Sequence, residues 1–397
     1  MEEILAKYRI ESSLPLEKAA EEICKEESVG TWTELQTLEP EIQKRLGANI
    51  VELDEESKTA TIAYAMEEYS HEPGGIPQLL SFVAGNLFGL SLLDKVRLVD
   101  IELPSTIVKL FQGPKYGIEG VRNLIGIKNR PLIGTIIKPK LGLSPKEQAD
   151  VFYKAARGGV DFGKDDENLV NQGFCPLLER TRQIAEAIDK VKEETGRKVY
   201  YAINVTTRAD KITEVAEEAL TNGATCLMVD MVCAGYAAIR ALADDDGINV
   251  PLHIHRAGHA AFTEDPQHGI TMLVLAKLAR LAGGDQLHTG TVVGKMKGMK
   301  EEVIQTNDFL KSEWFSLKNV FPVASGGVHP LLIPKMVELL GKDIVIQAGG
   351  GVHGHPSGTE AGARALKQAL DATLEKIPLE EYAEDHKELK EAVEKWK

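Results

Sequence analysis

The stretch at residues 160–168, VDFGKDDEN, decides the fold that the sequence predicts. A short apolar run ends in charged residues, and a longer stretch of helical periodicity follows it. Such apolar runs are typical of parallel strands that are buried on both faces. Seven further runs repeat the pattern: LIGTIIKP (132–139), VYYAINV (199–205), CLMVDM (226–231), VPLHIH (250–255), DQLHTG (285–290), VFPVAS (320–325) and IVIQAG (344–349).

Helical stretches separate these runs, for example residues 144–159, 175–196 and 270–283. Eight strand–helix units in about 280 residues predict a (β/α)₈ (TIM) barrel, and hence an α/β fold class. A doubly wound open sheet is the alternative, and the count of eight units disfavours it.

The residues before the barrel show a different order of elements. Short strands at 5–10, 48–56, 59–66 and 95–103 mix with helices at 14–27 and 76–89. This order predicts an α+β (ferredoxin-like) domain with its helices on one face of the sheet. The run FQGPKYG (111–117) breaks the pattern. We therefore expect an N-terminal domain at 1–112 and a catalytic barrel at 113–397.

Composition excludes several classes of partner. The net charge of −14 disfavours nucleic acid, because phosphate contacts need a basic face. No apolar run is long enough to suggest a membrane span, and the acidic N-terminus lacks the layout of a secretory signal. We expect a cytoplasmic protein. The cysteines, Cys24, Cys175, Cys226 and Cys233, show no metal-binding spacing, and we expect them to be small buried residues in a reducing compartment.

Polar groups and glycines follow six of the eight predicted strands. Because barrel active sites form at the carboxyl ends of the strands, we expect these groups to converge on one mouth. In chain order they are Lys138 and Lys140, then Lys164, Asp166 and Glu167, then His253, His255 and Arg256, then His288, then Ser325, Gly326 and Gly327, and finally Gly349, Gly350 and Gly351.

The acidic run at 164–167 is the most informative of these groups. The carboxylates of Asp166 and Glu167 suit Mg²⁺, a hard cation that prefers oxygen ligands. The ammonium group of Lys164 would repel a cation, unless CO₂ carbamylates it and makes it an anionic oxygen ligand. The alternative interpretation is an exposed charge run, which the position after an apolar strand disfavours.

The other groups suggest acid–base chemistry and anion binding. Lys138 and Lys140 are candidates for an acid or base with a lowered pKa, although such a pair can also be a solvated strand end. His253 and His255 share one face of a strand, but no third soft ligand for zinc follows at a recognisable interval. Arg256 beside a histidine better suits a phosphate or a developing enolate oxygen.

The glycine clusters let backbone N–H groups approach an anion closely, although glycines are also common in ordinary turns. The clusters at 326–327 and 349–351, on strands other than those of Arg256 and His288, would suit a substrate phosphorylated at both ends. Lys295 lies between Gly294 and Gly298, which is the layout of a flexible lid that carries a cation.

The motifs together resemble the large chain of ribulose-1,5-bisphosphate carboxylase/oxygenase (RuBisCO) over almost the whole sequence. The matching strings are GTWT (30–33), AGNLFG (84–89), KPKLGLS (138–144), KDDEN (164–168), HIHRAGHA (253–260), HTGTVVGK (288–295), ASGGVH (324–329) and QAGGGVHGHP (347–356).

The resemblance implies carboxylation of D-ribulose 1,5-bisphosphate by CO₂ to two 3-phosphoglycerates, with competing oxygenation, through a Mg²⁺-bound enediolate. Lys164 would be the CO₂-carbamylated base that binds Mg²⁺ with Asp166 and Glu167. Lys138 would protonate C2 with support from Lys140, His255 would assist hydration, and Lys295 would close over the incoming CO₂.

The resemblance also implies how the substrate and the partner subunit are held. Arg256, His288 and Ser325 would bind one phosphate. The other would be bound by Thr31, Trp32, Gly326, Gly327, Gly349 and Gly350. Glu26 and Asn86 match the positions that a partner subunit contributes to the site, which implies dimers with shared active sites and possible higher oligomers. No small subunit is expected.

The sequence departs from the plant-type pattern in ways that point to the archaeal (form III) type. The segments between Trp32 and Ala60 and between Lys295 and Ser325 are short, and Gly258 replaces a methionine. Two alternatives stay open. One is a RuBisCO-like enolase or isomerase of a methylthio-sugar phosphate that fixes no CO₂. The other is a catalytically silent barrel, which would tolerate Lys164→Ala.

Overall fold

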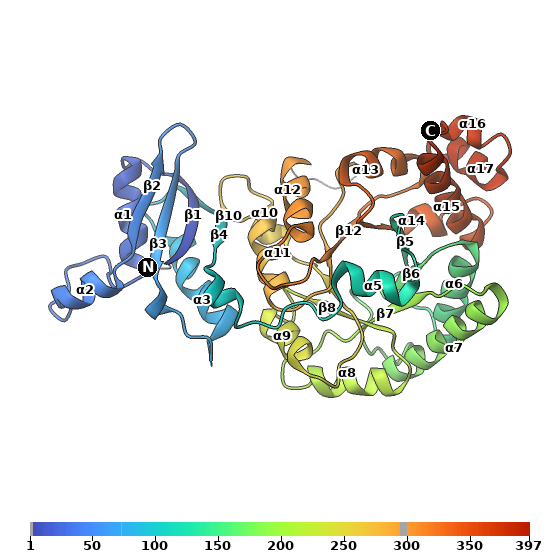
Figure 1. Cartoon of the computed structure of the whole chain (residues 1–397), viewed down its shortest axis with the longest axis horizontal. Coiled ribbons are helices and arrows are strands. Elements are labelled where there is room, and N and C mark those ends of the chain that lie inside the picture. The colour runs from blue at the N-terminus through green and yellow to red at the C-terminus, as the bar shows by residue number, and fades with distance from the viewer. Residues whose placement is uncertain (1–2, 73, 294–299) are drawn as a thin grey trace. The chain divides into compact units, whose positions relative to one another are not determined.

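All eight strands predicted for the barrel form, and they close in the order β11-β12-β13-β5-β6-β7-β8-β9. The neighbouring pairs are parallel, which confirms the (β/α)₈ fold (Figure 1). The computed structural model describes residues 3–72, 74–293 and 300–397. The barrel strands are β5 (Leu132–Ile136), β6 (Phe162–Lys164), β7 (Tyr200–Asn204), β8 (Cys226–Asp230), β9 (Leu252–His255), β11 (Gln286–His288), β12 (Phe321–Ser325) and β13 (Val345–Ala348).

Helices precede and follow the strands along the chain, and their ends carry local signals. The second of them begins at a capping box, in which the Ser144 hydroxyl accepts from the backbone N–H of Glu147 and the Glu147 side chain accepts from that of Ser144. These helices are α5 (Gly117–Ile125), α6 (Pro145–Gly158), α7 (Leu177–Thr195), α8 (Ile212–Thr221), α9 (Tyr236–Asp244), α10 (Ala260–Thr263), α11 (Met272–Leu281), α12 (Lys300–Lys311), α13 (Ile333–Leu340), α14 (Gly350–His353), α15 (Thr359–Glu375), α16 (Leu379–Tyr382) and α17 (Lys387–Trp396).

Apolar side chains fill one end of the barrel and leave the other end to polar groups. Val121 and Ile125 of α5 pack in one buried cluster with inward-facing residues of the strands. Those residues are Leu132, Phe162, Tyr200, Ala202, Cys226, Met228, Phe321, Val323 and Val345. Because α5 precedes β5 and closes the amino-terminal ends of the strands, the carboxyl ends are the open mouth.

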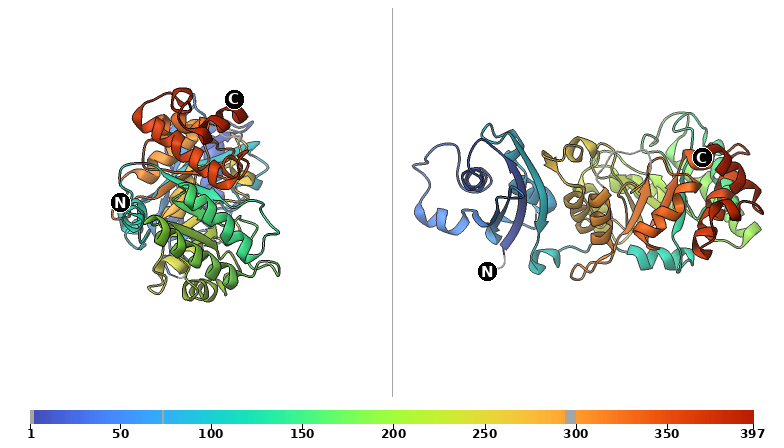
Figure 2. Two further views of the ribbon diagram at one scale, coloured as in Figure 1. Left: turned by 90° about the vertical axis from the view of Figure 1, so that its right-hand side faces the viewer. Right: turned by 90° about the horizontal axis from the view of Figure 1, so that it is seen from above.

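The N-terminal sheet forms as an α+β unit, with α1 packed on one face of the sheet (Figure 2). Its strand order is β10-β4-β1-β3-β2. β1 pairs antiparallel with β3 and β4, β2 pairs antiparallel with β3, and β10 pairs parallel with β4. The elements are β1 (Glu3–Glu11), α1 (Leu16–Glu26), α2 (Pro40–Leu46), β2 (Asn49–Asp54), β3 (Thr59–Ala65), α3 (Gly75–Val83), β4 (Lys95–Glu102), α4 (Ser105–Val108) and β10 (Gly269–Ile270).

The chain divides into two compact units, each of which is built from more than one segment. The first unit contains Met1–Phe111, Gly258–Leu281 and Phe315–Leu317. The second contains Gln112–Ala257, Ala282–Trp314 and Lys318–Lys397. Residues 258–281 group with the first unit because β10 adds a strand to its sheet, a pairing that no sequence pattern announces.

Two expectations from composition can be compared with the structure. Cys24, Cys175 and Cys226 are buried, as predicted. The prediction was wrong for Cys233, which is exposed because it follows β8 in the loop at the open end of the barrel. Within the described ranges, no helix is both long and apolar enough to cross a membrane.

Candidate active site

Lys164 ends β6 and is fully buried at the mouth of the barrel. Its Nζ donates a hydrogen bond to the carbonyl oxygen of Asp165 at 2.8 Å and lies 3.8 Å from Oε2 of Glu167. Burial lowers the pKa of Lys164 to about 8, even though the neighbouring carboxylates act in the opposite direction. About a tenth of this amine is therefore uncharged at pH 7, far more than for an ordinary lysine, and the uncharged amine is the reactive form.

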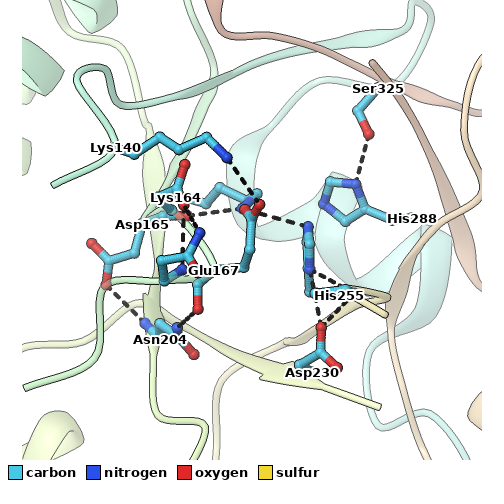
Figure 3. Close-up of polar contacts among 12 residues, drawn as sticks. Lys140, Lys164, Asp165, Glu167, Asn204, Asp230, His255, His288 and Ser325 are labelled. Carbon is cyan, nitrogen blue, oxygen red and sulfur yellow. Dashed lines mark hydrogen bonds and ion pairs between the residues drawn. The ribbon is translucent and has the colours of Figure 1, made fainter. Parts of the chain in front are cut away.

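The carboxylates of Asp166 and Glu167 lie near the lysines that follow β5 and the lysine that ends β6. Nζ of Lys138 lies 2.6 Å from Oδ2 of Asp166. Nζ of Lys140 lies 3.8 Å from Oε1 of Glu167 (Figure 3). Burial raises the pKa of Asp166, but the ion pair with Lys138 outweighs it and leaves that pKa below its ordinary value. The site therefore holds ionised carboxylates beside several amines.

The donor set determines whether Mg²⁺ fits this site. Among the described residues, no group of three or more histidine, cysteine, aspartate and glutamate side chains is arranged to hold a metal ion. Asp166 and Glu167 supply oxygen ligands, but the third group at their centre is the amine of Lys164. A carbamate on this amine would replace a cation by an anionic oxygen donor, so the residues fit Mg²⁺ once Lys164 is carbamylated.

A buried network behind the acidic run fixes its position. The carboxylate of Asp165 points away from the mouth and accepts from Nε of Arg180 at 3.1 Å, from the Tyr201 hydroxyl at 2.8 Å and from the backbone N–H of Asn204 at 2.8 Å. Asp165 and Arg180 are both fully buried. The Asn204 side chain in turn donates to the Glu167 carbonyl oxygen at 3.1 Å. The loop that carries Asp166 and Glu167 is thus tied to β7.

His255 connects the acidic run to β8. Its Nδ1 lies 3.1 Å from Oδ2 of Asp230, and its Nε2 lies 3.7 Å from Oε2 of Glu167 (Figure 3). Burial lowers the pKa of His255, which leaves a neutral imidazole near pH 7. Asp230 accepts the Nδ1 proton, so Nε2 is the basic nitrogen and faces the mouth.

A second polar group lies at the ends of β11 and β12. Nδ1 of His288 lies 2.8 Å from the Ser325 hydroxyl oxygen (Figure 3). The guanidinium of Arg256 packs over Gly290, where an added Cβ would meet its Nη2 at 2.4 Å. Burial lowers the pKa of Arg256 to about 10, which still leaves it a cation at neutral pH. This combination of cation, hydroxyl and imidazole suits an anionic oxygen.

The backbone conformation requires glycine after β12, and the glycines after β13 leave space beside the backbone without such a requirement. Gly326 and Gly327 have φ angles of 109° and 69°, a region that residues with a Cβ rarely adopt. A Cβ on Gly349 would lie 3.1 Å from Cε of Lys138. Gly350, the next residue, is the first residue of α14. The backbone can therefore approach a ligand closely at these two strand ends.

Some predicted residues are not part of this group. Lys295, with the flanking Gly294 and Gly298, lies outside the described residues. Four other predicted residues belong to the first unit, namely Glu26, Thr31, Trp32 and Asn86. In that unit Nδ2 of Asn86 donates to Oε1 of Glu26 at 3.2 Å, Thr31 is half-buried, and Trp32 is 88% exposed.

Sequence reasoning missed Asn204, Asp230 and Asp165. Asn204 is the last residue of β7 and Asp230 the last of β8, the third and fourth strands of the barrel. The rule that located the other groups, a polar residue at the end of an apolar run, also applies to VYYAIN and CLMVD. The sequence could not assign Asp165 a role different from that of Asp166, its neighbour in the same acidic run. Only the fold shows that the Asp165 side chain points away from the mouth, toward Arg180 and Tyr201.

The (β/α)₈ fold, with acid–base groups and candidate anion-binding groups at the carboxyl ends of its strands, is that of a barrel enzyme. Family models match both parts of the chain: the ribulose bisphosphate carboxylase large chain N-terminal domain over residues 1–107, and the catalytic domain of the same large chain over residues 117–396. The chain belongs to the RuBisCO large-chain family.

Individual relatives match over nearly their whole length. A protein of Methanocaldococcus jannaschii named ribulose bisphosphate carboxylase is 45% identical, with 96% of this chain and 94% of that protein covered. The crystal structure of an octameric RuBisCO from Pyrococcus horikoshii superposes with a TM-score of 0.93 at 43% identity, covering 99% of this chain and 93% of that one. A RuBisCO-like protein from Burkholderia fungorum reaches a TM-score of 0.88 at 29% identity, covering 99% of both chains.

Proposed function

We propose that this chain catalyses the carboxylation of D-ribulose 1,5-bisphosphate by CO₂ to two molecules of 3-phosphoglycerate, with oxygenation as a competing reaction. The observation that carries the proposal is the position of Lys164. It is an amine with a lowered pKa, it is fully buried, and the carboxylate of Glu167 lies 3.8 Å away. The names of the archaeal relatives support the same reaction.

The first step concerns Lys164 itself. Its uncharged amine would attack CO₂, form an N–C bond and release a proton, which leaves an anionic carbamate between Asp166 and Glu167. Mg²⁺, held by this carbamate and the two carboxylates, would stabilise the negative charge that develops on the substrate's oxygen atoms. The carbamate would then take the proton from C3 of the substrate, so that an enediolate forms.

The remaining residues would handle the later proton transfers. CO₂ adds at C2, and His255, whose basic Nε2 faces the mouth, would assist the addition of water at C3. Cleavage of the C2–C3 bond leaves a carbanion at C2, which Lys138 would protonate with Lys140 in support. Lys295, outside the described residues, is proposed to close over the incoming CO₂.

Two anion sites would hold the substrate's phosphates. Arg256, His288 and Ser325 would form one of these sites, with the His288–Ser325 distance at 2.8 Å. The backbone at Gly326, Gly327, Gly349 and Gly350, together with Thr31 and Trp32, would form the other. We further propose that Glu26 and Asn86 serve the site of a partner subunit in a dimer or higher assembly. The octameric state of the Pyrococcus horikoshii protein supports self-association. We propose that no small subunit takes part.

The test is an assay of the purified protein with Mg²⁺, labelled bicarbonate and ribulose 1,5-bisphosphate under warm, anaerobic conditions. We expect labelled 3-phosphoglycerate from the unchanged protein and from Lys146→Met, which alters an exposed lysine on α6. Lys164→Met should abolish it. If a methylthio-sugar phosphate turns over without incorporation of label, the chain is instead a RuBisCO-like enolase or isomerase. Activity in the Lys164→Met variant would contradict both.

A further inference from the structure

A continuous chain of polar side chains runs across the barrel strands from Tyr200 to Ser325. Nε2 of Gln286 donates to the Tyr200 hydroxyl oxygen at 2.9 Å, and Oε1 of Gln286 lies 3.0 Å from Nδ1 of His253. Nε2 of His253 lies 2.8 Å from Nε2 of His288, whose Nδ1 is 2.8 Å from the Ser325 hydroxyl oxygen. Four strands, β7, β9, β11 and β12, therefore contribute to a single file of hydrogen bonds.

All the hydrogen bonds in this file must be donated in the same direction, either inward, toward Tyr200, or outward, toward Ser325. Both imidazoles are buried, and burial holds the pKa of His253 and of His288 well below the ordinary value. A neutral imidazole has one N–H donor and one acceptor nitrogen. The hydrogen bond between the two rings requires one Nε2 to donate and the other to accept. The nitrogen that carries the proton in one imidazole therefore determines which nitrogen carries it in the other. The same choice fixes the donors at Gln286 and at Ser325.

The amide of Gln286 selects the direction, because a half-turn about its last bond exchanges oxygen and nitrogen with little change of shape. With its oxygen toward His253, every bond points inward and Ser325 donates to His288. The file then ends at the Tyr200 oxygen, and no described residue accepts the Tyr200 hydroxyl proton. A half-turn from this placement puts the amide nitrogen toward His253, so that Tyr200 donates to the amide oxygen and every bond points outward.

The outward direction satisfies one more buried donor than the inward direction. It uses the Tyr200 hydroxyl proton, which would otherwise be buried without a partner, since Tyr200 is only 8% exposed. It also makes His288 donate to Ser325, so the Ser325 hydroxyl keeps its own proton to offer at the mouth. A hydroxyl with a free proton binds an anionic oxygen, whereas one that donates inward presents only lone pairs.

We propose that Tyr200 and Gln286 are positioning residues that direct this file outward, so that the Ser325 hydroxyl donates to an anionic oxygen of the bound ligand. The inference rests on the proposed function in that it takes Ser325 as part of an anion site. Tyr200 and Gln286 touch no substrate. They act through the tautomers of His253 and His288.

The first experiment needs no turnover. The unchanged protein is labelled with [¹⁵N]histidine, and nitrogen resonances are assigned with His253→Gln and His288→Gln variants. We expect the Nε2–H tautomer at His253 and the Nδ1–H tautomer at His288. The opposite pair, Nδ1–H at His253 and Nε2–H at His288, would overturn the proposal. Because this result does not depend on the reaction, it is distinct from a failure of the carboxylation assay.

The second experiment measures the dissociation constant of inorganic phosphate in a double-mutant cycle. Tyr200→Phe keeps the ring but removes the terminal donor, and we expect binding to weaken about five-fold. In a Ser325→Ala background the same change should have no further effect. Tyr64→Phe, which removes a buried hydroxyl from the first unit, is the matched control and should leave binding unchanged. Equal weakening by Tyr200→Phe with and without Ser325 would show a merely structural role and overturn the proposal.

Discussion

The ammonium group of Lys138 lies 2.6 Å from Oδ2 of Asp166, so that a lysine beyond the end of one barrel strand is paired with a carboxylate beyond the end of the next. The Lys138 side chain is 30% exposed and that of Asp166 is 1% exposed. The pair holds the Lys138 amine near enough to Lys164 to add to the effect of burial in lowering the pKa of Lys164, while its partial exposure leaves Lys138 open to a ligand. This geometry supports the two roles proposed above, a base at Lys164 and an acid at Lys138.

Replacing Lys138 by methionine should separate the first proton transfer from the last. We expect product formation to fall by about 10²–10⁴-fold, the usual contribution of a positioned acid or base. Exchange of the substrate's C3 proton with solvent should persist, because Lys164 is unchanged. Both rates are measured with C3-tritiated substrate. Equal loss of exchange and product would place Lys138 in the first step and contradict the assignment.

Activation by CO₂ should depend on pH through Lys164. Only the uncharged amine attacks CO₂, and its pKa is about 8. Below that pH the initial rate of carbamylation at fixed CO₂ should fall about tenfold per unit, and above it the rate should level off. Chemical trapping of labelled carbamate followed by peptide mapping measures it, with Lys164→Arg as the control. A flat profile between pH 6.5 and 9 would contradict this prediction.

Asp230→Asn should impair His255 without unfolding the barrel. Asp230 accepts from Nδ1 of His255 at 3.1 Å, and the charge of Asp230 raises the His255 pKa against the lowering effect of burial. Without that charge His255 should be a weaker base, and kcat should fall roughly 10- to 100-fold, the usual cost of losing such a partner. The pH–rate profile, with thermal unfolding as the control, measures the effect. An unchanged profile would show that His255 takes no part.

Arg180→Met should destabilise the protein by about 3–5 kcal/mol, because it leaves the fully buried carboxylate of Asp165 without its cation. Arg182→Met is the matched control on the same helix. The Arg182 side chain is 55% exposed, so its change should stay within about 0.5 kcal/mol. Urea denaturation followed by circular dichroism measures both. Similar midpoints for the two variants would show that the buried pair contributes little.

His353 should make stability fall in acid. Its Nε2 lies 3.0 Å from the Thr135 hydroxyl and its Nδ1 lies 3.1 Å from the Thr359 hydroxyl. Burial lowers the pKa of His353 from 6.5 to about 4, so below pH 6.5 the unfolded chain binds a proton that the folded chain does not. Stability from this group is complete above pH 6.5 and is lost as pH falls toward 4.

The His353→Gln variant tests this dependence by urea denaturation at pH 7 and pH 4. Glutamine should fit the same two hydroxyls but does not titrate in this range. The variant should therefore lose less stability between the two pH values than the unchanged protein, by up to roughly 3 kcal/mol. The same loss in both proteins would show that His353 is not the group responsible.

The barrel could be predicted from sequence because its signal is local. Each strand is an apolar run with its own turn and helix signals, and the parallel topology then places every carboxyl end at one mouth. That rule located Lys164, His255, His288 and Ser325 without any knowledge of their neighbours. Applied to the third and fourth strands, it would also have located Asn204 and Asp230. The β10–β4 pairing could not be predicted, because a two-residue strand carries no periodicity.

The sequence by itself determined which chemical groups stand at the strand ends, because strand periodicity and chain direction depend only on neighbouring residues. The tertiary structure decided which of these groups meet: Lys138 with Asp166, His255 with Asp230, and Gln286 with His253. These pairings depend on the closure of the barrel and on burial at its mouth, which no single segment contains. The lowered pKa of Lys164 has the same origin, since desolvation is a property of everything that surrounds the amine.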